Sequence, residues 1–199
     1  MMETALNQAF DAFKIEAESI LETAKVLDPA EMQKAVEVLA KAERIASSGC
    51  GHSGIACRHF AHLMCCAERP AHFISPAEAV HGGLGYMKKG DVMLLVSRGG
   101  KTDELLTILD VCKEKGATII GVTENLESPL ATQADIVLAM KVTKECDKYN
   151  CQGTTSFAVT NAIFDALQAA VIEYTGYQKM DFALIHPGGA VGKRLNEKK

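Results

Sequence analysis

The sequence predicts an α/β fold with a parallel sheet covered by helices on both faces. Short apolar runs of β type alternate with segments of helical periodicity along most of the chain. Two glycine-rich loops each follow one of these runs and lead into a helix. Neither internal repeats nor low-complexity linkers interrupt the alternation. In such sheets ligands bind beyond the carboxyl ends of the strands, so we expect both loops on one rim.

Two helices are predicted before the first strand. Between residues 6 and 24 apolar side chains, among them Leu6, Phe10 and Phe13, recur every three or four positions, which predicts an amphipathic helix. Asp28 followed by Pro29 and then Glu31 is typical of a helix start. This helical pair is expected either to cover the sheet or to pack against another subunit.

The strands and later helices follow from composition and punctuation. Strands are predicted at residues 44–48, 71–74, 91–96, 118–123 and 135–140. Helices are predicted at residues 55–66 and 102–115 and from Thr154 to Gly176, with a short helical turn at 76–81 and a flexible loop at 82–85.

Size and charge narrow the class of protein. At 199 residues the chain suits a single domain, which we divide into a helical pair (1–42), a binding core (43–192) and a basic tail (193–199). A net charge of −4 argues against a nucleic-acid surface. No apolar run is expected to reach the roughly 20 residues that cross a bilayer, and residues 1–21 do not resemble a signal peptide. We therefore expect neither nucleic acid nor membrane as a partner.

The cysteines indicate a reducing compartment. There are seven of them, an odd number, and no CxxC pair. We therefore expect free thiols in the cytoplasm. Cys50 and His52 lie close together in sequence, but no second pair stands at ligand spacing, so no metal site is predicted.

The loop SRGGKT at residues 97–102 is the first candidate site. It joins an apolar strand to a helix, and helix N-termini present unpaired N–H groups and a positive dipole end. Together with the hydroxyls of Ser97 and Thr102, these groups suit a phosphate. The alternative is a tight turn that needs glycine only for its geometry.

Two nucleotide motifs are matched only in part. GCGHSG at residues 49–54 has the glycine spacing of a dinucleotide fingerprint, but the second strand ends in Ser75-Pro76 instead of the required acid. GKT at residues 100–102 resembles the end of a Walker A loop, but Leu95 stands where that motif needs its first glycine. A phosphorylated small molecule remains as the expected ligand.

Several side chains near these loops could move a proton near neutral pH. The candidates are His52, His81, Glu104, Glu145 and His186. Glu104 could instead serve as a favourable acid at a helix N-terminus, and His186 could anchor a turn.

With these motifs in view, residues 40–195 resemble the sugar isomerase (SIS) domain family, and within it the arabinose-5-phosphate isomerase branch. The resemblance depends on GCGHSG (49–54), PAEAVHGGLG (76–85), SRGGKTDE (97–104), KE (144–145), TTS (154–156) and HPGGAVG (186–192). It implies a five-stranded parallel sheet in a flavodoxin-like αβα sandwich, usually a tetramer. It also implies aldose–ketose isomerisation of a phosphosugar through a cis-enediol, without metal or organic cofactor.

The resemblance also implies roles for individual residues. The catalytic set would be His81, Glu104, Glu145 and His186. His186 or Glu104 would move the proton, His81 would open the ring or polarise the carbonyl, and His186 would reach a neighbouring subunit. The ligands of the sugar phosphate would be Gly51, His52, Ser53, Ser97, Arg98, Gly99, Gly100, Thr102, Thr154, Thr155 and Ser156.

The chain departs from the family pattern at named positions. His52 stands where a lysine is usual, Arg98 and Gly99 replace Asn and Ser, and Gly83 replaces an acid. The paired regulatory domains that often follow the isomerase domain are not expected. These departures keep a second function open, a sugar-phosphate-binding module that senses its ligand without turning it over. Phosphosugar lyase or deaminating chemistry is a third possibility.

Overall fold

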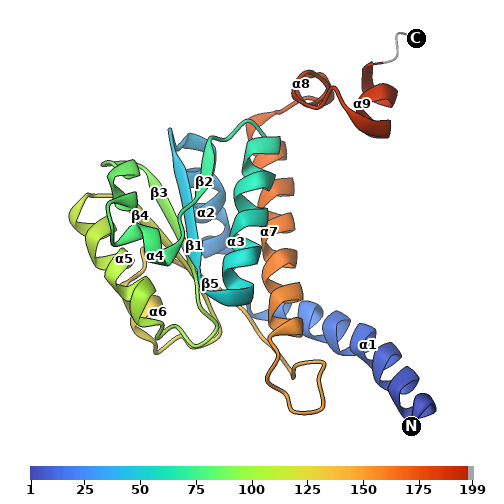
Figure 1. The fold of residues 1–199 in the computed structure, drawn as a ribbon. Helices are drawn as coiled ribbons and strands as arrows, with labels where there is room; N and C mark the ends of the chain where they lie inside the picture. Colours follow the sequence, from blue (N-terminus) through green and yellow to red (C-terminus); the bar gives the residue numbers. More distant parts are fainter. Residues whose placement is uncertain (197–199) are drawn as a thin grey trace.

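The computed structural model describes residues 1–196, and its centre is a parallel sheet (Figure 1). The five strands stand in the order β2-β1-β3-β4-β5, and every neighbouring pair is parallel. Their bounds are β1 Ile45–Gly49, β2 Ala71–Phe73, β3 Val92–Val96, β4 Thr118–Thr123 and β5 Ile136–Ala139. The predicted flavodoxin-like sheet is confirmed. Its topological switch point, where the strand order reverses, lies between β1 and β3.

The central strand β3 shows why the strands of this sheet are continuous apolar runs in the sequence. All five of its residues are buried. Val92, Leu94 and Val96 face one core cluster, whereas Met93 and Leu95 face the other. A strand alternates its side chains between faces, so burial on both sides requires apolar residues throughout.

Helices form the two outer layers (Figure 1). One layer is α2 (Pro29–Lys41), α3 (Gly51–Cys66) and α7 (Thr154–Thr175), which share the first core cluster. The other is α4 (Pro76–Ala79), η1 (Gly83–Tyr86), α5 (Asp103–Glu114) and α6 (Pro129–Gln133), which share the second. The expected flexible loop at 82–85 is wrong, because buried Leu84 orders this segment as the 3-10 helix η1.

Helix α1 (Met2–Val26) belongs to the body only through its second half. Its buried residues are Ile15, Ser19 and Thr23. The Ser19 hydroxyl accepts the Thr143 N–H at 3.1 Å, and the Thr23 hydroxyl both accepts the Lys141 N–H and donates to the Lys141 carbonyl at 2.9 Å. The first half projects from the body with its predicted apolar face exposed (Figure 1).

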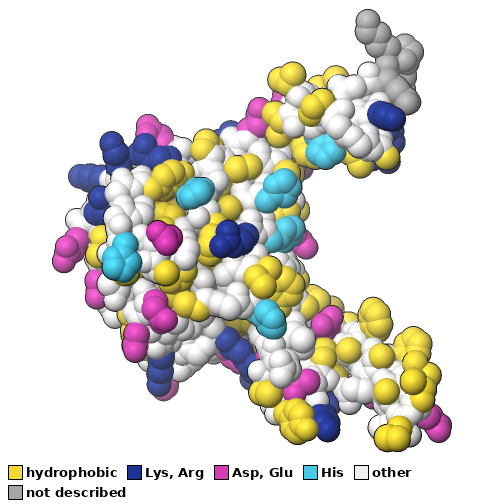
Figure 2. Space-filling model, in the orientation of Figure 1, with side chains coloured by type: hydrophobic (Ala, Val, Ile, Leu, Met, Phe, Trp, Pro, Cys, Tyr) yellow, Lys and Arg dark blue, Asp and Glu magenta, His cyan; other side chains and the backbone are white. Residues whose placement is uncertain are grey.

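The chain ends in a second projection made by α8 (Lys179–Ile185) and α9 (Gly189–Asn196) (Figure 1). Lys193 and Arg194, which begin the predicted basic tail at 193–199, lie in the last turn of α9. The rest of that tail, residues 197–199, lies outside the described residues. We call residues 2–14 of α1 the N-terminal arm and α8 with α9 the C-terminal arm. Figure 2 shows the hollow between the two arms.

Helix α7 corrects the expectation about apolar runs. By length and composition alone, its 22 residues are apolar enough to cross a membrane. Five of them, Val159, Ile163, Phe164, Leu167 and Val171, belong to the first core cluster, and the helix packs between α1, α2 and α3. The apolar composition of α7 is therefore that of a core helix in the layer that covers the sheet.

Candidate active site

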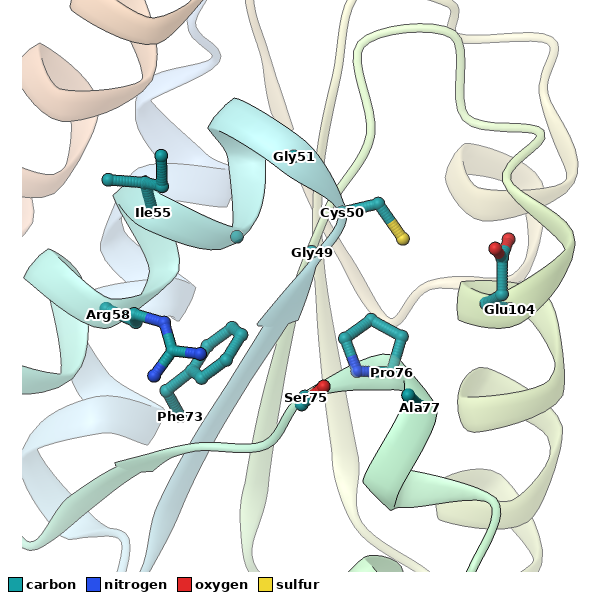
Figure 3. Close-up of a pocket in the computed structure, with 11 residues that line it drawn as sticks. Gly49, Cys50, Gly51, Ile55, Arg58, Phe73, Ser75, Pro76, Ala77 and Glu104 are labelled. Carbon is teal, nitrogen blue, oxygen red and sulfur yellow. The ribbon is translucent and has the colours of Figure 1, made fainter.

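One cavity lies at the carboxyl ends of the strands, beside the switch point between β1 and β3. Its volume is about 420 Å³. We call it the switch-point pocket (Figure 3); it is lined by Gly49, Cys50, Gly51, Gly54, Ile55, Arg58, Phe73, Ser75, Pro76, Ala77 and Glu104. Both predicted glycine loops meet this edge, as expected for parallel strands.

The glycines of the first loop allow α3 to start directly on β1. A Cβ atom on Gly54 would stand 2.5 Å from the Gly49 carbonyl oxygen, and Gly51 has a φ of +55°. These positions therefore need glycine for close packing and for a left-handed turn. Gly51 and Gly54 at the start of α3 line the pocket, and the unpaired N–H groups of a helix's first turn favour an anion.

The second loop is held in shape by its own hydroxyls. The Ser97 Oγ accepts the Gly100 N–H at 3.0 Å and lies 2.9 Å from the Thr102 Oγ1. Gly100 has a φ of +65°, and a Cβ there would collide with the Ser128 hydroxyl. The loop is thus preorganised at the start of α5, and Gly99 beside it has open space around it.

Arg98 is bound by two carboxylates. Its Nε donates to Glu124 at 2.8 Å, and its Nη1 donates to Glu145 at 2.7 Å. Two carboxylates therefore neutralise the guanidinium, which we expected to bind the phosphate of the ligand. The structure ties Arg98 to the loop after β5 instead.

Glu145 is a structural carboxylate in this arrangement. It is 2 % exposed. Besides Arg98, it accepts the Thr155 N–H at 2.7 Å and the Ser156 N–H at 3.3 Å. These bonds cap the first turn of α7 and hold the carboxylate of Glu145, a predicted catalytic residue, in a buried position.

The starts of α3 and α7 lie side by side. The His52 Nδ1 is 3.2 Å from the Gly153 carbonyl oxygen, which immediately precedes α7. His52 and Thr154 both line a second cavity of about 510 Å³ between α1, α3 and α7. The Thr154 hydroxyl accepts the Cys146 N–H at 3.2 Å, and the Thr155 hydroxyl lies 3.2 Å from the Cys146 sulfur. Two helix N-termini therefore converge where the resemblance places the phosphate.

Glu104 is the acid that faces the switch-point pocket (Figure 3). It is exposed, and among the described residues it has neither an ion-pair partner nor a hydrogen-bond partner. Across the pocket edge, the Cys50 side chain points toward it (Figure 3). Partial burial, followed by the charge of Glu104, raises the pKa of the Cys50 thiol. Glu104 is thus available to exchange a proton with a bound molecule.

The two remaining predicted histidines line neither cavity. His81 is exposed between α4 and η1. His186 ends α8 in the C-terminal arm, with its ring 5.0 Å from that of Phe182 and its buried Nδ1 without a partner. The structure therefore brings Glu104, the first loop and the second loop together, and leaves His186 away from them within one chain.

Of the eleven residues that line the switch-point pocket, the predicted site contained Gly51 and Glu104; the other nine are Gly49, Cys50, Gly54, Ile55, Arg58, Phe73, Ser75, Pro76 and Ala77. Arg58 lies seven residues after Gly51, a spacing that places both on one face of α3, so helical periodicity could have found it. No local sequence pattern marks Phe73 or Ser75 as pocket residues, because only sheet pairing brings the end of β2 beside α3. Among the described residues no group of three or more His, Cys, Asp or Glu could hold a metal ion.

Comparison with known proteins gives a consistent picture. The SIS domain model matches residues 38–170. The chain is 40% identical over 163 residues to the arabinose 5-phosphate isomerase KdsD of Pseudomonas aeruginosa, covering 81% of this chain and 50% of that protein. It is 31% identical over 198 residues to KdsD of Francisella tularensis, covering 98% and 60%. The chain thus spans about half the length of these curated relatives.

Solved structures extend the similarity to the whole described fold. An Escherichia coli CFT073 protein in complex with A5P superposes with a TM-score of 0.84 at 30% identity, covering 94% of this chain and all of that one, 100%. A Bacteroides fragilis protein described as a phosphosugar isomerase candidate involved in capsule formation superposes with a TM-score of 0.85 at 27% identity, covering 93% and 98%. The switch-point pocket, the two glycine loops and these matches together show that the chain belongs to the SIS domain family.

Proposed function

We propose that the chain is an aldose–ketose isomerase that acts on a phosphosugar of the arabinose 5-phosphate kind. The observation that carries this proposal is Glu104, a carboxylate without a partner among residues 1–196 that faces a pocket built on the start of α3. The relatives named arabinose 5-phosphate isomerases support the same reaction class. The A5P-bound relative supports the same class of ligand.

The proposed chemistry is a proton transfer between C1 and C2 of the open-chain sugar. Glu104 takes the C2 proton, a cis-enediol forms, and the protonated Glu104 returns the proton to C1. The helix N-termini hold the phosphate, because their N–H groups and dipoles favour an anion. Its proposed ligands are the loop residues Gly51, His52, Ser53, Ser97, Gly99, Gly100 and Thr102 and the α7 start at Thr154, Thr155 and Ser156. His81 is kept as the proposed ring-opening residue.

We further propose that the protein works as a cytoplasmic homotetramer in which His186 serves a neighbouring subunit. His186 stands in the projecting C-terminal arm, whereas its own pocket lies at the sheet edge. Exposed apolar side chains on both arms, such as Phe10, Phe13 and Leu184, would be covered by other copies. All seven cysteines are free thiols, in keeping with a reducing compartment.

The second candidate is a sugar-phosphate sensor without turnover. The observation that favours it is the charge of the loops: His52 stands at the usual lysine position, and Arg98 is neutralised by Glu124 and Glu145. An anion would then find less positive charge than in a typical family member.

One experiment separates the two functions. A thermal-shift panel of pentose and hexose phosphates identifies the ligand, since ligand at 100 times its Kd stabilises by roughly 2.7 kcal/mol. Proton NMR of the best ligand in deuterated water then follows exchange at C1 or C2. Exchange together with ketose formation supports the isomerase, whereas stabilisation without exchange supports the sensor. No stabilisation by any sugar phosphate would contradict both.

A further inference from the structure

Arg58 is a second charged group in the switch-point pocket, and no role has been given to it above. Of the residues that line this pocket, only Arg58 and Glu104 carry a full charge at neutral pH. They lie on opposite sides of it, Arg58 beside Phe73 and Glu104 at the start of α5 (Figure 3). The pocket is therefore polarised, with one cation and one anion facing a common space.

The Arg58 guanidinium packs on an aromatic ring and has no carboxylate partner among the described residues. Its central carbon lies 4.1 Å from the centre of the Phe73 ring. Such a cation–π contact contributes about 0.5–1 kcal/mol and restricts the side chain. No carboxylate oxygen of residues 1–196 lies within 4.0 Å of its nitrogens, in contrast to Arg98, which bonds two carboxylates. Its donors are consequently available to a ligand.

The position of Arg58 along α3 fixes which part of a ligand it would meet. Gly51, Gly54, Ile55 and Arg58 all line the pocket, so it follows one face of the helix from its first turn. Seven residues of helix span about 10 Å, comparable with an extended pentose phosphate. A phosphate at the start of α3 therefore leaves the opposite, carbonyl end of the sugar beside Arg58.

We propose that Arg58 is a catalytic residue that binds the C1 and C2 oxygens and stabilises the enediolate. This rests on the proposed isomerase function. When Glu104 removes the C2 proton, the C2–H electron pair forms the C1–C2 double bond and the carbonyl electrons move onto O1. The guanidinium donates hydrogen bonds to that developing oxyanion and stays protonated throughout. Proton transfer from the C2 hydroxyl to O1, then return of the proton from Glu104 to C1, completes the ketose, so no other reactant is needed.

The role also accounts for how the pocket works without the usual lysine. His52 lines the second cavity between α1, α3 and α7 instead of the switch-point pocket. Arg98 is neutralised. Among the residues that line the switch-point pocket, Arg58 alone supplies a permanent positive charge near the reacting carbons.

The test compares Arg58→Ala, Arg58→Lys and a matched control, Lys89→Gln, in steady-state isomerisation of arabinose 5-phosphate. Lys89 is an exposed cation that precedes β3 at the opposite edge of the sheet. Removal of an oxyanion donor lowers kcat by about 100-fold or more, so Arg58→Ala should lose kcat far more than it raises KM. The kcat of Arg58→Lys should lie between those of wild type and Arg58→Ala, because lysine keeps the charge and loses the forked donor geometry. The Lys89→Gln variant should match wild type.

Chemical rescue distinguishes catalysis from folding. Added guanidinium ion at millimolar concentration should restore part of the kcat of Arg58→Ala and none of that of Glu104→Gln. Kinetic constants of Arg58→Ala within twofold of wild type would overturn the inference. So would a loss of kcat that guanidinium does not restore and that accompanies a lower melting temperature.

A binding measurement keeps this inference separate from the proposed function. If wild type turns over no phosphosugar, the isomerase proposal fails, and affinities for arabinose 5-phosphate and inorganic phosphate still test Arg58. Arg58→Ala should then lower the affinity for arabinose 5-phosphate at least tenfold and leave the affinity for inorganic phosphate unchanged. Equal loss for both ligands, or no loss for either, would contradict the assignment of Arg58 to the sugar end.

Discussion

Glu104 and Glu145 carry the same side chain and differ entirely in what surrounds it. Glu104 is exposed and faces the switch-point pocket without a partner among the described residues. Glu145 is buried and bonds Arg98 and the first turn of α7. A carboxylate that moves protons needs a free lone pair within reach of the substrate. In the proposed isomerase, Glu104 would therefore move the proton, and Glu145 would hold Arg98 and the start of α7 in place.

The first prediction concerns Glu104. Glu104→Gln should lower kcat by about 10²–10⁴-fold, because the amide keeps the shape and removes the base. The free energy of unfolding should fall by about 1 kcal/mol at most, because only the interaction of the charge with the α5 N-terminus is lost. The matched control is Glu114→Gln, at the exposed far end of the same helix α5. Activity of Glu104→Gln close to that of wild type would place the base elsewhere.

The second prediction concerns Glu145. Glu145→Gln should destabilise the fold by about 1–3 kcal/mol, because an amide cannot accept all the hydrogen bonds that the buried carboxylate accepts from Arg98, Thr155 and Ser156. Chemical denaturation of the variant and of wild type measures this difference. A variant of normal stability that has lost turnover would instead return Glu145 to the catalytic set.

At the scale of elements, one carboxylate joins α2 to the edge of the sheet. Glu31 accepts the Lys34 ammonium at 2.6 Å and the Val137 N–H, at the start of β5, at 2.9 Å. The Lys34 hydrogen bond, and then that of Val137, lowers the pKa of Glu31 from its usual 4.5. The N-terminal helical pair therefore covers the sheet through α2 and meets the segment after β5 through α1.

The third prediction follows from that lowered pKa. The ionised Glu31 stabilises the fold above the unfolded pKa near 4.5, and this contribution is lost as the pH falls through the lower folded value. Glu31→Gln should cost about 1 kcal/mol at about pH 7 and much less at about pH 3. Urea denaturation at both pH values measures it. The control is Glu37→Gln, which loses only the ion pair with Lys41 at 3.7 Å. A loss of stability in Glu31→Gln that is the same at both pH values would contradict the role of the ionised Glu31.

At the scale of the whole molecule, the two arms carry exposed apolar side chains outside the body of the chain. They project on either side of a hollow in front of α3 and α7 (Figure 2). Their exposed apolar residues include Leu6, Phe10 and Phe13 on the N-terminal arm and Met180 and Leu184 on the other. Large exposed apolar surface of this kind marks a protein interface. In the proposed homotetramer, other copies would cover this surface, and His186 would reach a neighbouring copy's pocket.

The fourth prediction tests that shared site by complementation. Glu104→Gln and His186→Ala should each be inactive alone. Co-expressed, they should recover up to about a quarter of wild-type activity, because random pairing gives half mixed pairs with one intact site each. Co-expression of each variant with itself is the control. No recovery in verified mixed assemblies would place Glu104 and His186 of one site on the same chain.

Local sequence patterns were enough for the fold and for the backbone of the site. Alternation of β-type runs with helical spacing predicted all five strands, and the glycine loops marked the edge where ligands bind. The patterns failed where a neighbour distant in sequence decides. In α1 the apolar stripe through Phe10 and Phe13 is exposed, whereas Ser19 and Thr23 are buried because they complete the hydrogen bonds of the segment after β5.

The sequence by itself determined the α/β class, the strand positions, the phosphate-type loops and the resemblance to one family, because periodicity and turn residues act over a few positions. Only the tertiary structure decided which side chains remain available to a ligand. Arg98 meets Glu145 across 47 positions of sequence, and Arg58 meets Phe73 only because β2 pairs with β1 beside α3. The charge that a site offers is what remains after such long-range pairs have formed, and no local pattern records those pairs.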